Sequence, residues 1–430
     1  MSRIGIHWFR KDLRLQDNES LQALAKSVDH VICVYIHSSQ NLSPDIEYSL
    51  CKHEVKGNHR KRFLRESLDD LNKSLEALGQ TLIELDEQHS VVAALVEMVK
   101  ANNISAISCE WHCGFNERAQ WEVLKESLPD LEFIQCNSSS LYDQSGLPFP
   151  LDELPDTFTP FRKKVEKRST RRPICLHVGS LPPPYSMKET SSRAKKENKE
   201  SQPHYPLLVG GESAAKRQLD YYLWDTDLLS NYKQTRNGLD GWDFSSKLSA
   251  WLAHGCISPT TVADAITEYE HQRTKNDSTY WLFFELLWRE FFHWQHVKNG
   301  VSSFDKAGPK QLEITSHFDQ SKYDDWCNGT TGYDIVDACM KQLNQTGFMS
   351  NRGRQLVASC FVHELNLDWR YGAAYFEYQL IDFDVASNYG NWQYLAGVGA
   401  DPRGHRQFNL VKQTEFYDPS RQFIQQWLVK

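Results

Sequence analysis

The chain has 430 residues, of which 40% are hydrophobic and 24% charged, and a formal net charge of −8. This length predicts two or three domains, and the composition predicts a buried core and excludes an intrinsically disordered chain. The negative charge disfavours a general polyanion binder, although a local basic surface is compatible with it. The N-terminus is not typical of a secretory signal and no apolar run could span a bilayer, so we expect a cytoplasmic protein without membrane contact. The ten cysteines show no paired metal-binding spacing, and we expect reduced thiols and no metal site.

Short apolar runs alternate with amphipathic helical patterns over the first part of the chain. This alternation predicts an α/β domain at residues 1–140, built on a doubly wound parallel sheet in which each strand is followed by a helix. The predicted strands are Ile4–Phe9, Val31–Ile36, Thr81–Leu85, Ile104–Cys109 and Leu131–Gln135.

The pattern changes over residues 141–206, which are rich in proline and serine and include the charged patch Lys195–Glu200. We expect a long connector here, with one short helix near Phe158–Lys167. The stretch FRKKVEKRSTRR, from Phe161 to Arg172, is the most basic in the chain. It could be a solvated face of the connector or a contact for phosphates, and the sequence leaves both open. Helical periodicity dominates the rest, which predicts an all-α domain at residues 207–430.

Aromatic residues gather in the second half, where ten of the 13 tryptophans follow residue 220. The helical stretch WLFFELLWREFFHW, Trp281–Trp294, brings Glu285, Trp288, Arg289 and Phe292 onto one face. A glutamate and an arginine on an apolar face need partners. They could pair with each other beside packing rings, or they could belong to a wall that stacks a nucleic-acid base and hydrogen-bonds its edge.

A serine-rich stretch, Phe244–Ser249, precedes a helical segment. Serine hydroxyls and free backbone N–H groups at the start of a helix form a natural site for an anion, to which Lys247 adds positive charge. The signal is weak when taken alone, because serines cap helices in most proteins.

Two aspartates, Asp382 and Asp384, lie in an apolar run towards the end of the chain. Buried carboxylates need cationic partners, and Arg352 and Arg354 are the obvious candidates. The spacing would also suit a divalent cation, but no third acidic ligand or phosphate loop accompanies it, which disfavours a metal. We therefore expect a buried network of arginine and aspartate in the helical domain.

Three motifs in the chain match one family. They are WFRKDLRLQDNESL at Trp8–Leu21, ELLWREFF at Glu285–Phe292, and TGFMSNRGRQLVAS…LDWR…DFDVASNYGNWQY within Thr346–Tyr394. With them the chain resembles the photolyase/cryptochrome superfamily from end to end, and most closely the DASH cryptochromes. Gln355 and Tyr394 are the residues that point to this branch.

The resemblance implies that the helical domain binds FAD in a folded shape. Arg354 would pair with Asp382, and Asn388 would lie opposite the flavin N5, where an amide can donate to the oxidised ring or accept from the reduced one. The implied cofactor-binding residues are Tyr232, Ser245, Ser246, Lys247, Leu248, Ser249, Glu285, Arg289, Asn351, Arg354, Asp382, Asp384 and Asn388.

An electron-transfer route is implied as well. Trp392 and Trp369 match the two inner members of the family's chain of tryptophans, between which an electron hops towards the flavin. The outer tryptophan is missing, because Ser316 and His317 occupy that part of the sequence. Tyr323 is a candidate substitute for it.

The resemblance further implies an enzyme, a deoxyribodipyrimidine photolyase-like lyase that repairs cyclobutane pyrimidine dimers under blue light. An electron would pass from the excited, reduced flavin to a dimer flipped out of the strand, and flipping costs least in single-stranded DNA, the expected substrate. RNA is a further candidate partner, and we expect a monomer. The implied catalytic residues are Glu285, Trp288, Asn351, Gln355 and Asn388. The implied substrate contacts are Glu285, Trp288, Gln355 and Tyr394.

Two further implications concern light capture and signalling. Asn116 and Glu117 resemble the place where many family members hold a folate antenna, 5,10-methenyltetrahydrofolate; the alternative is an ordinary exposed helix start. The alternative function is a blue-light photoreceptor or DNA-binding regulator with little or no repair turnover. The sequence favours that function only weakly, because it ends at Lys430 without a long polar tail.

Overall fold

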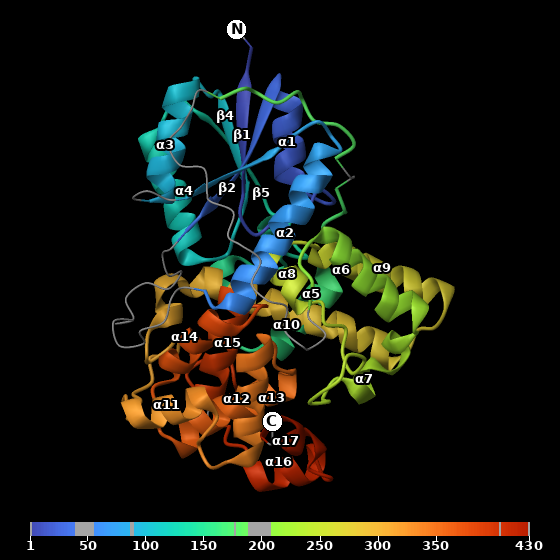
Figure 1. The fold of residues 1–430 in the computed structure, drawn as a ribbon, viewed down its shortest axis with the longest axis vertical. Coiled ribbons are helices and arrows are strands. Elements are labelled where there is room, and N and C mark those ends of the chain that lie inside the picture. The colour runs from blue at the N-terminus through green and yellow to red at the C-terminus, as the bar shows by residue number, and fades with distance from the viewer. Residues whose placement is uncertain are drawn as a thin grey trace.

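The computed structural model describes residues 2–38, 56–86, 90–175, 178–187, 208–403 and 406–428. An α/β part comes first in the chain and a helical part follows, and the two lie one above the other in Figure 1. This arrangement confirms the predicted fold class. The charged patch predicted at Lys195–Glu200 lies outside the described residues.

Five parallel strands form one sheet in the order β3-β2-β1-β4-β5. All five predicted strands are present, each within two residues of its expected bounds. The order places β1 beside β4, and the crevice at the carboxyl ends of two such strands is where open α/β sheets bind ligands. The strands are β1 (Ile4–Phe9), β2 (His30–His37), β3 (Leu82–Asp86), β4 (Ala106–Glu110) and β5 (Glu132–Cys136).

Helices cover both faces of this sheet. Helices α1 (Glu19–Ser27) and α2 (Asn58–Glu76) pack into one hydrophobic core, and α3 (Val91–Asn102) and α4 (Phe115–Ser127) pack into a second. A strand between two covered faces is apolar along its whole length, and β1 accordingly buries all six of its residues.

The connector carries one α-helix within the described residues, α5 (Phe158–Arg168), which confirms the short helix predicted there. Its buried residues, Phe158, Phe161 and Val165, recur at helical spacing, and the two phenylalanines pack against the middle of the helical part's longest helix, while most of its cations face outwards. The connector therefore packs as part of the molecule along this stretch.

Beyond residue 208 the described chain forms helices and no strand, as predicted, apart from one isolated bridge between His317 and Leu367. The longest helix begins with a capping box between Asn276 and Thr279. The helices are α6 (Glu212–Asp220), α7 (Tyr232–Thr235), α8 (Ser249–His254), α9 (Pro259–Gln272), α10 (Asp277–Asn299), α11 (Gln320–Asn328), α12 (Asp334–Thr346), α13 (Asn351–Ser359), α14 (Trp369–Gln379), α15 (Val385–Ala396), α16 (Leu410–Tyr417) and α17 (Gln422–Leu428).

A buried polar network joins the two parts. The guanidinium of Arg14 donates to Glu110 at 3.0 Å and to the backbone oxygen of Gly255 at 2.8 Å. Glu212, at the start of α6, accepts from the backbone N–H of Leu15 at 2.7 Å. Because buried charges are costly unless they are paired, these contacts fix how the parts sit together.

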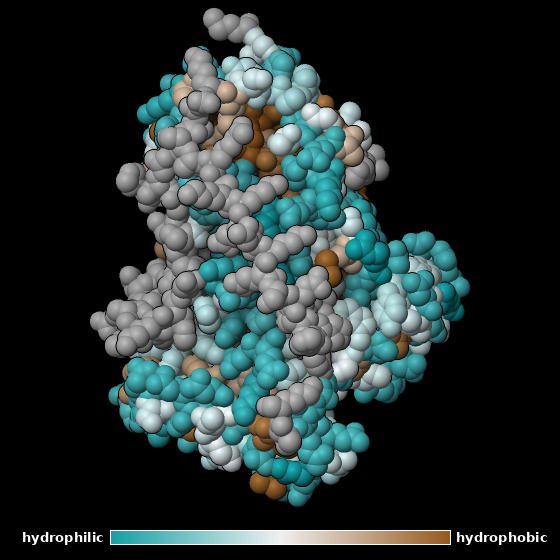
Figure 2. All heavy atoms as spheres, in the orientation of Figure 1, coloured by the Kyte–Doolittle hydropathy of each residue, from teal (hydrophilic) through white to brown (hydrophobic). Residues whose placement is uncertain are grey.

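Among the residues that Figure 2 colours by hydropathy, most of the surface on this face is hydrophilic, and hydrophobic residues appear in small, separate patches. In the part of the chain that the structure describes, no helix has the length and apolar character needed to cross a membrane.

Candidate functional site

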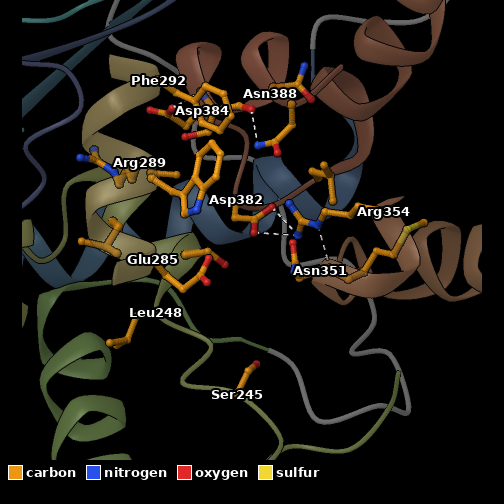
Figure 3. Close-up of a pocket in the computed structure, with 18 of the residues that line it drawn as sticks. Ser245, Leu248, Glu285, Arg289, Phe292, Asn351, Arg354, Asp382, Asp384 and Asn388 are labelled. Atoms are coloured by element: carbon orange, nitrogen blue, oxygen red, sulfur yellow. Dashed lines mark hydrogen bonds and ion pairs between the residues drawn. The ribbon is translucent and has the colours of Figure 1, made fainter. Parts of the chain in front are cut away.

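A cavity of ≈ 480 Å³ lies in the helical part, lined by α10, α13, α15 and the segment before α8 (Figure 3). This volume is typical of a site for a small organic ligand or cofactor. Every residue that the resemblance assigned to FAD lines the cavity, and so do Trp288, Gln355, Tyr394 and Trp392. Trp369 is buried outside the lining.

One end of the cavity carries a buried cation. In Figure 3, Ser245 and Leu248 lie at the end opposite Asn388. The ammonium of Lys247 lies 3.3 Å from the ring centroid of Phe244 and, among the described residues, has no hydrogen-bond partner. Burial lowers the pKa of Lys247 from 10.5 to about 7. A desolvated cation of this kind suits an anionic ligand group such as a phosphate.

Asp382 and Arg354 form an ion pair in the middle of the cavity wall (Figure 3). One guanidinium nitrogen of Arg354 donates to both carboxylate oxygens of Asp382, at 2.8 and 3.0 Å, which confirms the predicted pair. Arg352 was the other candidate partner, and that prediction is wrong. Its guanidinium lies over the ring of Tyr417 at 4.5 Å, because two residues along a helix turn the side chain to a different face.

Asp384 takes its countercharge from α10. Burial alone would raise the pKa of Asp384, but the charge of Arg289 and hydrogen bonds from Ser387 bring it down to about 2. The carboxylate also caps α15, accepting from the backbone N–H of Ser387 at 2.8 Å. Asp384 therefore remains ionised at the edge of the cavity.

Glu285 pairs with Arg236, at 2.9 Å. The alternative of a mutual pair with Arg289 is wrong, since Arg289 donates to the backbone oxygen of Ser139 at 2.7 Å. Burial raises the pKa of Glu285, and the charge of Arg236 offsets this only in part. Arg236 is a lining residue that the sequence reading missed; its position one helical turn after Tyr232 is the signal that could have found it.

Asn388 has a fixed orientation. Its side-chain N–H₂ donates to the backbone oxygen of Ala373 at 3.0 Å, which leaves its carbonyl oxygen available to the cavity. An acceptor held in this way favours a ligand group that carries a hydrogen.

Two rings form a corner in the cavity. The rings of Trp288 and Tyr394 lie 6.0 Å apart between centroids, with planes 87° apart. Both line the cavity, together with Gln355. The face of α10 predicted from the helical spacing is therefore present, with Glu285 and Trp288 on the cavity side.

The tryptophans of the implied electron route are both buried. Trp392 packs against Phe376 at 5.2 Å and Trp326 at 6.1 Å between ring centroids. The indole N–H of Trp369 donates to the backbone oxygen of Lys306 at 3.0 Å. Tyr323, the candidate substitute for the outer member, is buried with its ring 6.3 Å from that of Tyr371.

A second, smaller cavity of ≈ 90 Å³ lies where β1 and β2 end, and Glu117 lines it. One carboxylate oxygen of Glu117 lies 3.5 Å from His112, and the other is buried without a hydrogen-bond partner among the described residues. Asn116 beside it is half-buried. The alternative of an ordinary exposed helix start is wrong for Glu117, which is only 4% exposed.

The basic stretch of the connector divides into two groups. Three arginines form ion pairs: that of Arg162 lies within α5, and those of Arg171 and Arg172 tie the connector to other parts of the chain. These pairs are Arg162–Glu166, Arg171–Asp264 and Arg172–Asp17. The remaining cations, on α5, are exposed, which is compatible both with a solvated face and with a contact for phosphates. They are Lys163, Lys164, Lys167 and Arg168.

The fold and the cavity together define a protein of the photolyase and cryptochrome class. Residues 5–183 match the family model described as "DNA photolyase", and residues 281–430 match the model described as "FAD binding domain of DNA photolyase". The chain is 45% identical over 427 residues to a cryptochrome DASH of Idiomarina loihiensis, covering 99% of this chain and 92% of that relative. It is 44% identical over 425 residues to one of Vibrio parahaemolyticus, covering 99% and 93%. The chain belongs to the cryptochrome DASH family.

Solved structures agree with this assignment. The chain is similar to the Synechocystis cryptochrome, with a TM-score of 0.94 and 37% identity, covering 100% of this chain and 89% of that one. A bacterial class III photolyase from Agrobacterium tumefaciens has a TM-score of 0.85 at 27% identity, covering 100% and 87%. An archaeal photolyase from Sulfolobus tokodaii, solved with two FAD molecules, has a TM-score of 0.73 at 26% identity, covering 99% and 90%.

Proposed function

We propose that this protein uses blue light to split cyclobutane pyrimidine dimers, preferentially in single-stranded DNA, as an FAD-dependent photolyase-like lyase. One observation carries the proposal. The cavity that is lined by the residues suited to FAD is also lined by Glu285, Trp288 and Tyr394, which suit a pyrimidine dimer. Cofactor and substrate must be in contact, with water excluded, and a shared cavity provides both conditions.

The lining fits FAD in charge and in chemistry. Lys247 is a buried cation that a phosphate of the cofactor would pair with, and Asn388 offers a carbonyl oxygen to a hydrogen-bearing ring nitrogen. Arg354, already paired with Asp382, keeps part of its guanidinium free for a further acceptor. Bound FAD would supply the electron chemistry, because its reduced form absorbs blue light and can give an electron to a group in contact with it.

The substrate half of the cavity fits a dimer outside the DNA stack. The rings of Trp288 and Tyr394 stand nearly perpendicular, and the two pyrimidines of a cyclobutane dimer are not coplanar either. Burial raises the pKa of Glu285, so this carboxyl can take up a proton and donate a hydrogen bond to a pyrimidine carbonyl. Because unpairing adds to the cost of flipping, a strand without a complement is the preferred substrate.

We also propose that the second cavity holds 5,10-methenyltetrahydrofolate as an antenna. The unpartnered oxygen of Glu117 would accept from the donor edge of the pterin, and Arg10 and Lys56 in the same lining would attract the carboxylates of the folate tail. A near-ultraviolet absorption band in the purified protein that disappears in Glu117→Gln would support this assignment. The same band in the variant would contradict it.

Illumination of the purified, reduced protein with a dimer-containing oligonucleotide tests the main proposal. We expect dimers to disappear faster from a single strand than from the same sequence in a duplex, and Glu285→Ala to abolish repair. The proposal fails if no dimers are lost at any wavelength that the flavin absorbs. A light-dependent change in gene expression that persists in Glu285→Ala would then favour the photoreceptor or DNA-binding regulator. We also propose that the protein acts as a cytoplasmic monomer. RNA is a further candidate partner, and binding of an RNA oligonucleotide to the purified protein tests it.

A further inference from the structure

The indole of Trp288 has a flat partner behind it. Phe158, the first residue of α5, lies against this indole with ring centroids 3.8 Å apart and planes only 10° apart. Phe158 is 5% exposed and does not line the cavity, whereas Trp288 does. Phe158 therefore covers one face of the indole, and the indole lines the cavity beside Phe292 and Tyr394, at 5.5 and 6.0 Å between ring centroids. The partner comes from the connector, outside the region that matches the FAD-binding domain.

The orientation of this pair differs from that of the rings around it. Phe158 meets Phe284 at 84° and Phe291 at 73°, both edge to face, which is the usual way in which core rings pack. Of these three neighbouring rings, only that of Trp288 is parallel to the ring of Phe158. The phenyl ring therefore packs flat against the indole and supports its orientation.

Polar contacts hold Phe158 in register with α10. The ammonium of Lys298 donates to the backbone oxygen of Leu154 at 2.9 Å, ahead of α5. Arg162, one turn into α5, donates to the hydroxyl of Tyr280, at the other end of α10. The segment is thus tied to α10 on both sides of the stacked pair. These contacts restrain the backbone that carries Phe158 relative to α10.

We infer that Phe158 is a positioning residue for dimer recognition, holding the indole of Trp288 flat in the plane that a flipped pyrimidine stacks on. The inference rests on the proposed function. An indole that packs against another ring is already ordered before the substrate binds, so that binding does not have to restrict its rotation. Leucine at this position would keep a buried apolar side chain and lose the flat face.

The test compares two substitutions in the same helix. Phe158→Leu removes the face behind Trp288. Phe161→Leu, the control, removes a buried ring one turn away that packs on Phe149 and Phe291. Fluorescence anisotropy in the dark gives the affinity for a labelled single strand with one thymine dimer and for the undamaged strand. Thermal unfolding and flavin absorbance show that each variant is folded and loaded.

We expect wild type to prefer the damaged strand and Trp288→Ala to lose the preference. Phe158→Leu should reduce it by roughly three- to tenfold, the range of one aromatic contact and one ordered side chain. Phe161→Leu should keep it, although both leucine variants lower the unfolding temperature. The inference would be overturned, and the proposed function left standing, by either of two results. In one, Phe158→Leu prefers the damaged strand as strongly as wild type does; in the other, both leucine variants lose this preference equally. A wild type without any preference would overturn the proposed function, and the inference with it.

Discussion

Lys247 makes the stability of the protein without FAD depend on pH. Burial lowers its pKa from 10.5 to about 7, and each pKa unit corresponds to about 1.4 kcal/mol, so the buried ammonium costs at most about 5 kcal/mol. Between these two values the unfolded chain holds a proton that the folded chain has lost. The free energy of unfolding therefore rises with pH from about 7 towards 10.5, and the full cost is present below pH 7.

Lys247→Met removes this cost, because methionine has a similar length and no charge. Without FAD, the variant should be more stable than wild type at pH 7, and the difference should shrink as the pH rises towards 10. FAD should bind the variant roughly 10- to 100-fold more weakly, since a buried cation is lost from its phosphate site. In wild type the affinity should fall by up to about tenfold per pH unit above 7, because binding takes up a proton; the variant should not show this slope.

Two measurements on the flavin-free protein test the expected stability and the expected affinity for FAD. Urea unfolding between pH 6 and 10 gives the stability difference, and FAD fluorescence quenching gives the affinity over the same range. Lys412→Met, an exposed lysine on α16, is the matched control and should change neither. A Lys247→Met protein that is less stable than wild type at pH 7, or that binds FAD with the same pH slope, would refute the reasoning.

Two other substitutions test the cavity wall. Asp382→Asn leaves Arg354 facing a neutral group. Because Arg354 is partly exposed, we expect the free energy of unfolding, measured in urea titrations, to fall by only about 1–3 kcal/mol. Unchanged stability would show that the pair contributes nothing. Trp392→Phe keeps a ring in the core but removes the readily oxidised indole, so photoreduction of the bound flavin, followed by its absorbance, should slow. Photoreduction at the wild-type rate would exclude Trp392 as the nearest donor.

The sequence predicts best those features that depend on a single helix or strand. The strands of the sheet follow from apolar runs that must be buried on both faces, and the shared face of Glu285 and Trp288 follows from the helical repeat alone. Arg354 was predictable as a candidate partner, because a buried carboxylate demands a cation, but its pairing with Asp382 followed from the resemblance. The same argument chose Arg352 wrongly, since it ignored which face of α13 that arginine occupies.

The remaining partners depend on contacts between elements, which no local pattern encodes. Glu285 has an arginine four residues away on its own helix, yet it pairs with Arg236, the residue that follows α7. The burial of Glu117 results from the packing of the α4 start against the end of β1, and its motif looks like an ordinary helix start. Phe158 carries no signal at all, because a phenylalanine in a connector is usual.

The α10 face shows how far the site depends on segments that precede the helical part. Arg289 supplies the charge that keeps Asp384 ionised, and its own guanidinium is held by the backbone oxygen of Ser139. Trp288 takes its plane from Phe158. Since both supports lie before residue 208, the helical part alone would keep the cavity residues but lose the contacts that orient two of them. The α/β part and the connector thus contribute to the cavity by orienting Arg289 and Trp288, quite apart from any antenna, and the geometry of the cavity is a property of the whole chain.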